Sequence, residues 1–137
     1  MASLTSTGGH ASRRTHRILM DDTDGDARAQ YRASLNGCDV IEAADGRDAL
    51  VKALSQRPAL VITEIGLPII DGYALCEVLR RDSMTRTVPI LVVTTTTAVP
   101  ELDRARAIGV DGVLTKPVTS DALLEAVERL IGRPCKP

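Results

Sequence analysis

Short apolar runs alternate with longer amphipathic segments along the chain. The runs lie at residues 17–21, 38–43, 59–64, 89–94 and 110–115. The first, third and fourth are nearly continuous in Ile, Leu and Val, which is typical of parallel strands covered on both faces. The segments after the runs place apolar residues at helical spacing, as Leu123, Val127 and Leu130 do in the last one. The pattern therefore predicts a strand followed by a helix, five times over.

Helix boundaries are marked by residues with special backbone preferences. Gly37, Gly109 and Gly132 each follow an amphipathic segment, where a helix end favours a residue that can adopt left-handed backbone angles. Residues 120–121 supply start signals for the last helix. The first helix has two candidate caps, the loop carboxylates Asp21, Asp22 and Asp24 or the following Asp26. Alternating strands and helices joined by right-handed crossovers predict an α/β fold, a doubly wound five-stranded parallel sheet of order 2-1-3-4-5.

Length and charge narrow the classes of function. The 137 residues have room for one domain, and we expect a disordered tail at 1–15, the domain at 16–132 and a C-terminal tail at 133–137. A formal charge of −1 gives no general attraction to nucleic acid, and no apolar run is long enough to cross a bilayer. Tyr31 and Tyr73 are the only aromatic residues, too few for a nucleic-acid stacking platform. We therefore expect neither nucleic acid nor membrane as a partner.

The cysteines give no sign of a structural site. Cys38, Cys76 and Cys135 are odd in number, widely spaced and contain no CxxC pair. This pattern suggests neither a disulfide framework nor a zinc site, so we expect small core or surface residues. The first fifteen residues lack the apolar stretch of a secretory signal. Together these features favour a reducing compartment and a cytoplasmic protein.

Polar residues gather at the ends of the predicted strands. In a sheet of this kind, functional residues lie beyond the carboxyl ends of the strands, at the switch point between the first and the third. The first run ends in residues 21–24 (DDTD), the third in Glu64, the fourth in residues 94–97, and the fifth is followed by Lys116 and Pro117. Carboxylates suit Mg²⁺, and a lysine beside a hydroxyl suits an anionic oxygen.

Over roughly residues 17–131 the sequence resembles the receiver domains of two-component response regulators, which have a CheY-like variant of the flavodoxin-like fold. The resemblance rests on ALVITEIGLPIIDGYALCEVLRR at 59–81, VPILVVTT at 88–95 and GVDGVLTKP at 109–117. The family has two acids after the first strand, a phosphate-accepting aspartate after the third, a Ser or Thr after the fourth and Lys-Pro after the fifth. Asp22 then matches the first acid, Thr94 the hydroxyl, Lys116 the lysine, and Pro117 a proline that is usually cis.

The departures from the family pattern are informative. Glu64 occupies the phosphoacceptor position, Thr23 replaces the second acid, and Val113 replaces the aromatic residue whose rotation reports phosphorylation in the family. Asp21 stands where the family has an apolar strand residue. Because an aspartate inside a covered strand is costly, we expect either that the strand ends one residue early or that Asp21 turns into the pocket and compensates for Thr23.

The resemblance and its departures together favour a protein-binding signalling module, a pseudo-receiver of two-component phosphorelay signalling without normal aspartyl phosphorylation, and not a metabolic enzyme. Glutamate is one methylene longer than aspartate, so Glu64 is expected to reach toward Lys116 and to imitate a phosphoryl group only in part. Asp22, Glu64 and the carbonyl of Gly66 are the expected ligands of a weakly bound Mg²⁺.

The resemblance also implies where partners bind. A histidine kinase or a downstream signalling protein is expected on the fourth helix, fifth strand and fifth helix, here 101–108, 110–115 and 120–131, with Thr94 and Val113 as switch positions. A homodimer stays open, as does the identity of the kinase and of the output. One alternative is a phosphorylatable receiver with an unusual acceptor. A flavodoxin-like cofactor protein is disfavoured, because the acidic stretch 21–26 would repel a phosphate.

Overall fold

The computed structural model describes residues 17–135. Its strands form one parallel sheet: β1 (Arg17–Asp21), β2 (Asp39–Ala43), β3 (Leu60–Thr63), β4 (Ile90–Thr94) and β5 (Gly112–Thr115). Their order, β2-β1-β3-β4-β5, confirms the predicted topology. The last strand begins two residues later than predicted. Asp111 lies in the bend before it, and the carboxylate of Asp111 accepts a hydrogen bond from the backbone N–H of Ile90 at 2.8 Å.

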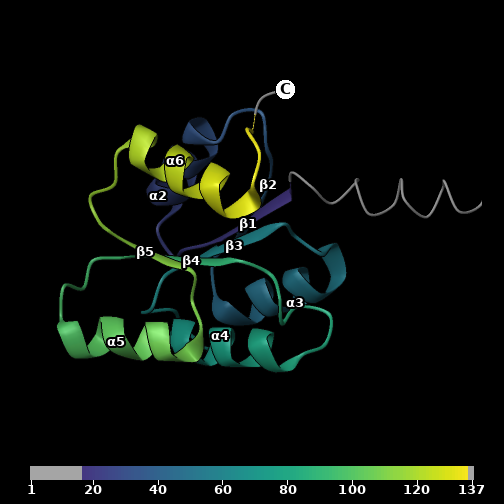
Figure 1. Ribbon diagram of the computed structural model, residues 1–137, viewed down its shortest axis with the longest axis vertical. Coiled ribbons are helices and arrows are strands. Elements are labelled where there is room, and N and C mark those ends of the chain that lie inside the picture. Colours follow the sequence, from purple (N-terminus) through teal and green to yellow (C-terminus); the bar gives the residue numbers. More distant parts are fainter. Residues whose placement is uncertain (1–16, 136–137) are drawn as a thin grey trace, which may run out of the picture.

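Helices cover both faces of the sheet. They are α2 (Gly25–Ser34), α3 (Gly46–Gln56), α4 (Gly72–Arg81), α5 (Val99–Ile108) and α6 (Ser120–Ile131). Figure 1 shows α2 and α6 on one face and α3, α4 and α5 on the other. The nearly continuous apolar character of β1, β3 and β4 follows from this arrangement, because both faces of those strands are buried.

The sheet separates two apolar cores. One lies under α2 and α6 and includes Ile18 and Met20, and the other lies under α3 and α4 and includes Leu19. Successive residues of β1 therefore face opposite layers, as the pleat of a strand requires. This alternation decides where the polar residues at the end of β1 point.

The helix ends agree with the sequence signals in part. Of the candidate caps for α2, the loop residue Asp24 is the one that caps the helix, accepting a hydrogen bond from the backbone N–H of Asp26 at 2.9 Å, and Asp26 itself is not the cap. Thr119 caps α6, one residue before the predicted start signals. Gly109 and Gly132 end α5 and α6 with φ of 109° and 75°, which confirms the left-handed residues expected there.

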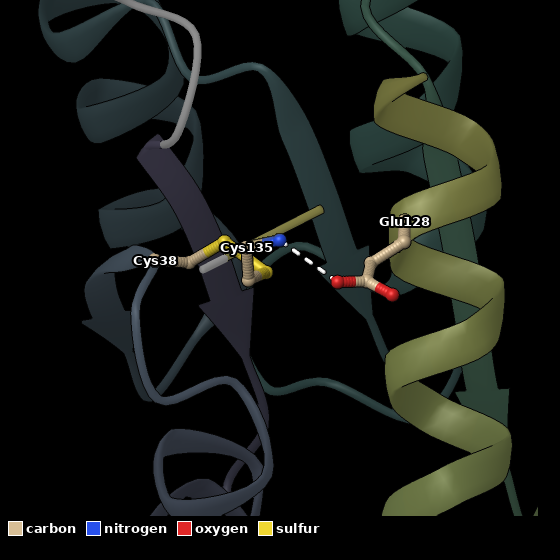
Figure 2. The surroundings of a disulfide bond; sticks show 3 residues. All are labelled: Cys38, Glu128 and Cys135. Atoms are coloured by element: carbon tan, nitrogen blue, oxygen red, sulfur yellow. Dashed lines mark hydrogen bonds between the residues drawn. A yellow bond between two sulfur atoms is a disulfide. The ribbon is translucent and has the colours of Figure 1, made fainter. Parts of the chain in front are cut away.

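The expectation of no disulfide is wrong. Cys38 and Cys135 are bonded to one another across a sequence separation of 97 residues, as Figure 2 shows. Cys76 is a free thiol and is buried, and burial raises its pKa to about 12. Cys135 is 1% exposed, so part of the predicted tail 133–137 lies against the domain. The predicted tail at 1–15 and residues 136–137 lie outside the described residues.

Within residues 17–135, no helix combines the length and the apolar character needed to cross a bilayer.

Candidate functional site

A cleft with a volume of about 380 Å³ opens where the strands of the sheet end. Its walls come from the ends of β1, β3 and β4, the loops that follow them and the residue after β5. The lining residues are Asp22, Thr23, Asp24, Glu64, Ile65, Gly66, Thr94, Thr95, Thr96, Glu101 and Lys116. The fold thus brings together most of the side chains that sequence patterns singled out.

Lys116 lies at the centre of the polar contacts. Its Nζ is 2.7 Å from Oδ2 of Asp22 and 3.2 Å from Oε2 of Glu64. Asp22 is 2% exposed and has two further donors, because its Oδ2 accepts from the Tyr31 hydroxyl at 3.2 Å and its Oδ1 from the backbone of Asp24 at 3.0 Å. One ammonium is therefore shared by two carboxylates, and one of those is almost fully hydrogen-bonded.

These contacts and burial set the pKa values of Lys116 and Tyr31. Burial alone would lower the pKa of Lys116, but the hydrogen bond to Asp22 and the contact with Glu64 outweigh it, and the net pKa is raised. Burial, assisted by the neighbouring Asp22, raises the pKa of Tyr31 to about 12. Lys116 thus stays charged and Tyr31 stays a donor throughout the physiological pH range.

Glu64, which the resemblance aligns with a phosphate acceptor, is engaged at both oxygens. Its Oε1 accepts a hydrogen bond from the backbone N–H of Ile65 at 2.8 Å, and its Oε2 pairs with Lys116. The predicted approach of Glu64 to Lys116 is confirmed. The first of these bonds turns the longer side chain back over its own loop.

The threonines that line one wall of the cleft lie at the end of β4 and in the loop after it. Thr94 is 2% exposed, pairs with Thr115 of β5, and accepts a hydrogen bond from the backbone of Thr96 at 3.3 Å. The peptide bond between Lys116 and Pro117 is cis, as the resemblance implies. Val113 lies half-buried in β5, opposite Val92. The structure therefore places Thr94 and Val113 on neighbouring strands, where the resemblance puts its switch pair.

Glu101 is a cleft residue that the sequence patterns missed. It lies in the first turn of α5, and its carboxylate accepts a hydrogen bond from the Thr96 hydroxyl. Its backbone carbonyl accepts from the hydroxyl of Tyr73 at 3.1 Å. No local motif marks Glu101, because only the turn after β4 brings it to the cleft. It adds a further acidic side chain to the wall.

Asp21 does not line the cleft, which corrects both expectations for it. The strand does not end early, because Asp21 is the last residue of β1 and pairs with Ala43 and Thr63. Nor does it compensate for Thr23, since the pleat of β1 puts its side chain on the face of Leu19, under α3 and α4.

The environment of Asp21 is unfavourable for a charge. The residue is 1% exposed, and both carboxyl oxygens lack a hydrogen-bond partner among the described residues. Burial, and then the carboxylates of Asp45, Asp22 and Asp48, raise the pKa of Asp21 to about 8. At neutral pH the side chain is therefore held mostly in its protonated form.

The residues of the cleft fit a divalent cation poorly. Asp22 and Glu64 are the two carboxylates expected as ligands, and both contact Lys116. Thr23 is exposed at the rim and carries no carboxylate, while Gly66 offers only its carbonyl. Within residues 17–135, no group of three or more His, Cys, Asp and Glu side chains is arranged to hold a metal. A hard cation would find fewer anionic oxygens here than it prefers.

Sequence comparisons agree on one family. The family model described as response regulator receiver domain matches residues 18–128. The chain is 34% identical over 92 residues to protein PilG of Pseudomonas aeruginosa, covering 67% of this chain and 68% of that protein. It is 38% identical over 119 residues to response regulator MprA of Mycolicibacterium vanbaalenii, covering 85% of this chain and 51% of that protein. The chain spans about half the length of several curated relatives.

Solved structures show the same fold. The chemotaxis response regulator CheY4 of Vibrio cholerae is 31% identical, with a TM-score of 0.79, over 83% of this chain and 97% of that chain. The receiver domain of the sensor histidine kinase PA1611 of Pseudomonas aeruginosa, solved with magnesium coordinated in its active site cleft, is 27% identical. Its TM-score is 0.80, over 85% of this chain and 98% of that chain.

Proposed function

Since this chain belongs to the response regulator receiver domain family, we propose that it is an atypical receiver of two-component signalling. It acts as a protein-binding module in the cytoplasm and does not undergo normal aspartyl phosphorylation. It is not a metabolic enzyme. The observation that carries this proposal is the position of Glu64, whose two carboxylate oxygens are taken by the Ile65 backbone and by Lys116.

Phosphoryl transfer depends on position. The attacking oxygen, the phosphorus and the leaving oxygen must lie roughly in line, and a misplacement of about 1 Å is costly. The extra methylene of Glu64 displaces its carboxylate from where an aspartate would meet the phosphorus. An oxygen that already accepts a hydrogen bond from its own loop must also give up that bond before it can attack.

Metal support for such a transfer is weak as well. Asp22, Glu64 and the carbonyl of Gly66 are the groups that would hold Mg²⁺, which would neutralise charge on an incoming phosphoryl group. Thr23 supplies no carboxylate at the rim, and Lys116 already pairs with both carboxylates expected as ligands, Asp22 and Glu64. Both features lower the affinity for the cation.

The output of the module is protein binding. We assign the partner surface to α5, β5 and α6, with a histidine kinase or a downstream signalling protein as the partner. Val113 has no ring that could swing between a buried and an exposed position, so this face is expected to hold one conformation. Binding is then constitutive rather than switched by the cleft.

Intact-mass spectrometry tests the proposal. The protein is incubated with acetyl phosphate and Mg²⁺, and no mass gain of a phosphoryl group is expected. The matched variants are Glu64→Asp and Glu64→Asp/Thr23→Asp, which restore first the acceptor and then the second acid; weak and then stronger labelling is expected. A phosphoryl gain on the unaltered protein that disappears in Glu64→Gln would overturn the proposal.

The second candidate function is a phosphorylatable receiver with a glutamyl acceptor. The arrangement of Asp22, Thr94 and Lys116 around the cleft favours it, because these groups match the family pattern. The same experiment decides between the two, since the second candidate requires labelling at Glu64.

A further inference from the structure

The disulfide joins two segments that follow helices on the same face of the sheet. Cys38 lies in the turn between α2 and β2, and Cys135 lies four residues after the end of α6. Cys135 is 1% exposed and belongs to the core under these two helices, while Cys38 is half-buried against it. Figure 2 shows the bond beside Glu128 of α6.

The two helices form a connected pair between the cleft and the disulfide. α2 begins after the cleft residue Asp24, and α6 begins a few residues after Lys116. Polar contacts join them along the way, because Gln30 donates to the carbonyl of Val118 at 3.1 Å and the hydroxyls of Ser34 and Ser120 lie 2.9 Å apart. The disulfide closes the pair beyond both helix ends.

Few other interactions hold the segment 133–135. The backbone N–H of Arg133 donates to the carbonyl of Glu128 at 3.2 Å, which continues the end of α6. The backbone N–H of Cys135 donates to the Glu128 carboxylate at 2.8 Å. Pro134 has no N–H to donate. Beyond α6, the segment is therefore linked to the rest of the domain by the disulfide and by the packing of Cys135 in the core, and the disulfide is the only covalent link between them other than the chain itself.

We propose that the Cys38–Cys135 disulfide is a redox-sensitive clasp. In the oxidised protein the bond ties segment 133–135 to the turn that follows α2. Reduction by a dithiol, either a protein or a small molecule, releases that segment while the domain stays folded. In the cytoplasm, where the proposed function places the protein, disulfides are rare and those that form are usually transient and redox-sensing, which fits a signalling module. The clasp is an input that does not pass through Glu64, so it stands whether or not the cleft accepts a phosphoryl group.

The chemistry is a two-step thiol–disulfide exchange. A thiolate of the dithiol attacks the sulfur of Cys38, the more accessible of the two, and Cys135 leaves as a thiolate. The second thiolate of the dithiol then attacks the mixed disulfide and releases Cys38. Two electrons pass to the protein, the dithiol becomes a disulfide, and the two new thiolates take protons from water.

Alkylation kinetics test the clasp, with Cys76 as an internal reference because it is 2% exposed and stays free in both states. The protein is treated with dithiothreitol or left oxidised, then exposed to iodoacetamide and followed by peptide mass spectrometry. In the oxidised protein no cysteine is expected to react quickly. After reduction, Cys38 and Cys135 are expected to react about tenfold or more faster than Cys76, because a released segment is open to solvent.

Two variants sharpen the test. Cys38→Ser leaves Cys135 as a thiol without any reductant, and its Cys135 is expected to react as in the reduced protein. Cys38→Ser/Cys135→Ser should keep the native far-UV circular dichroism. The clasp is refuted if excess dithiothreitol fails to reduce the folded protein, or if reduced Cys135 is as protected as Cys76. It is also refuted if reduction abolishes the native circular dichroism, because the disulfide would then support the whole domain.

Discussion

Lys116 places its ammonium 3.2 Å from a carboxylate oxygen of Glu64. The lysine follows β5 and the glutamate follows β3, so the contact ties two strand ends that are not neighbours in the sheet. Lys116 also pairs with Asp22 at 2.7 Å. The ammonium of Lys116 is thus already paired with two carboxylates, and the consequences of this arrangement can be measured.

Metal affinity should depend on Thr23. We expect the unaltered protein to bind Mg²⁺ only in the millimolar range or weaker, and Thr23→Asp to tighten binding about tenfold, since it adds an anionic oxygen at the rim of the cleft. Isothermal titration calorimetry measures both affinities. Thr97→Asp adds the same charge outside the set of lining residues and serves as the control. Equal affinities for the unaltered protein and Thr23→Asp would contradict the assigned ligand positions.

Partner binding should be insensitive to the charge of Glu64. Because we propose that Val113, which has no ring to move, does not couple the cleft to the partner surface, Glu64→Gln is expected to change the affinity for a protein partner by less than about 1 kcal/mol, the lower end of usual allosteric coupling. The measurement is calorimetry against a partner isolated by pull-down. Val113→Tyr, made with and without Glu64→Gln, tests whether an aromatic residue restores coupling. A tenfold loss of affinity in Glu64→Gln alone would show instead that the carboxylate holds an active-like state.

Asp21 should make stability depend on pH. Its pKa in the folded protein is about 8, above the ordinary value of 3.8 for an aspartate, so folding favours the protonated form. The stability that Asp21 contributes is full below about pH 4 and is lost as the pH rises toward 8, by at most about 1.4 kcal/mol per pH unit. Urea unfolding at a series of pH values should show this slope in the unaltered protein and a smaller one in Asp21→Asn.

Two further variants test whether the buried carboxyl group of Asp21 causes this pH dependence. Asp21→Val is expected to raise the free energy of unfolding by about 2–4 kcal/mol at pH 8, because it removes a buried acid without a hydrogen-bond partner. Asp103→Asn alters an exposed aspartate of α5 and should leave the pH slope unchanged. If Asp21→Val is less stable than the unaltered protein at pH 8, Asp21 has a partner that the contacts do not show.

Arg80 should resist even conservative replacement. Its guanidinium donates to the carbonyls of Gly109 at 2.9 Å and Val88 at 2.7 Å and pairs with Asp111 at 2.9 Å, joining α4 to the segments that precede β4 and β5. A lysine cannot supply this fork of donors, so Arg80→Lys is expected to cost about 2–3 kcal/mol in urea unfolding. Arg81→Lys, at an exposed position of the same helix, should change stability by less than about 0.5 kcal/mol. Equal stability of both variants would show that these bonds contribute little.

Much of the architecture follows from local sequence patterns. The apolar runs identify all five strands, because a strand buried on both faces must be apolar at successive positions. The contact between Glu64 and Lys116 was also expected, since parallel strands end at one edge and their terminal side chains meet there. Such features depend on periodicity and on strand order, both of which are visible along the chain.

Other features were decided only by tertiary structure. The bond between Cys38 and Cys135 spans 97 residues, and no spacing rule relates a turn after α2 to a segment after α6. The side of the sheet that Asp21 faces depends on the register of β1, because a shift of one residue would move its side chain to the opposite layer. Glu101 reaches the cleft because the turn after β4 carries it there. Sequence patterns predict which elements form, while the packing of those elements decides which distant side chains meet.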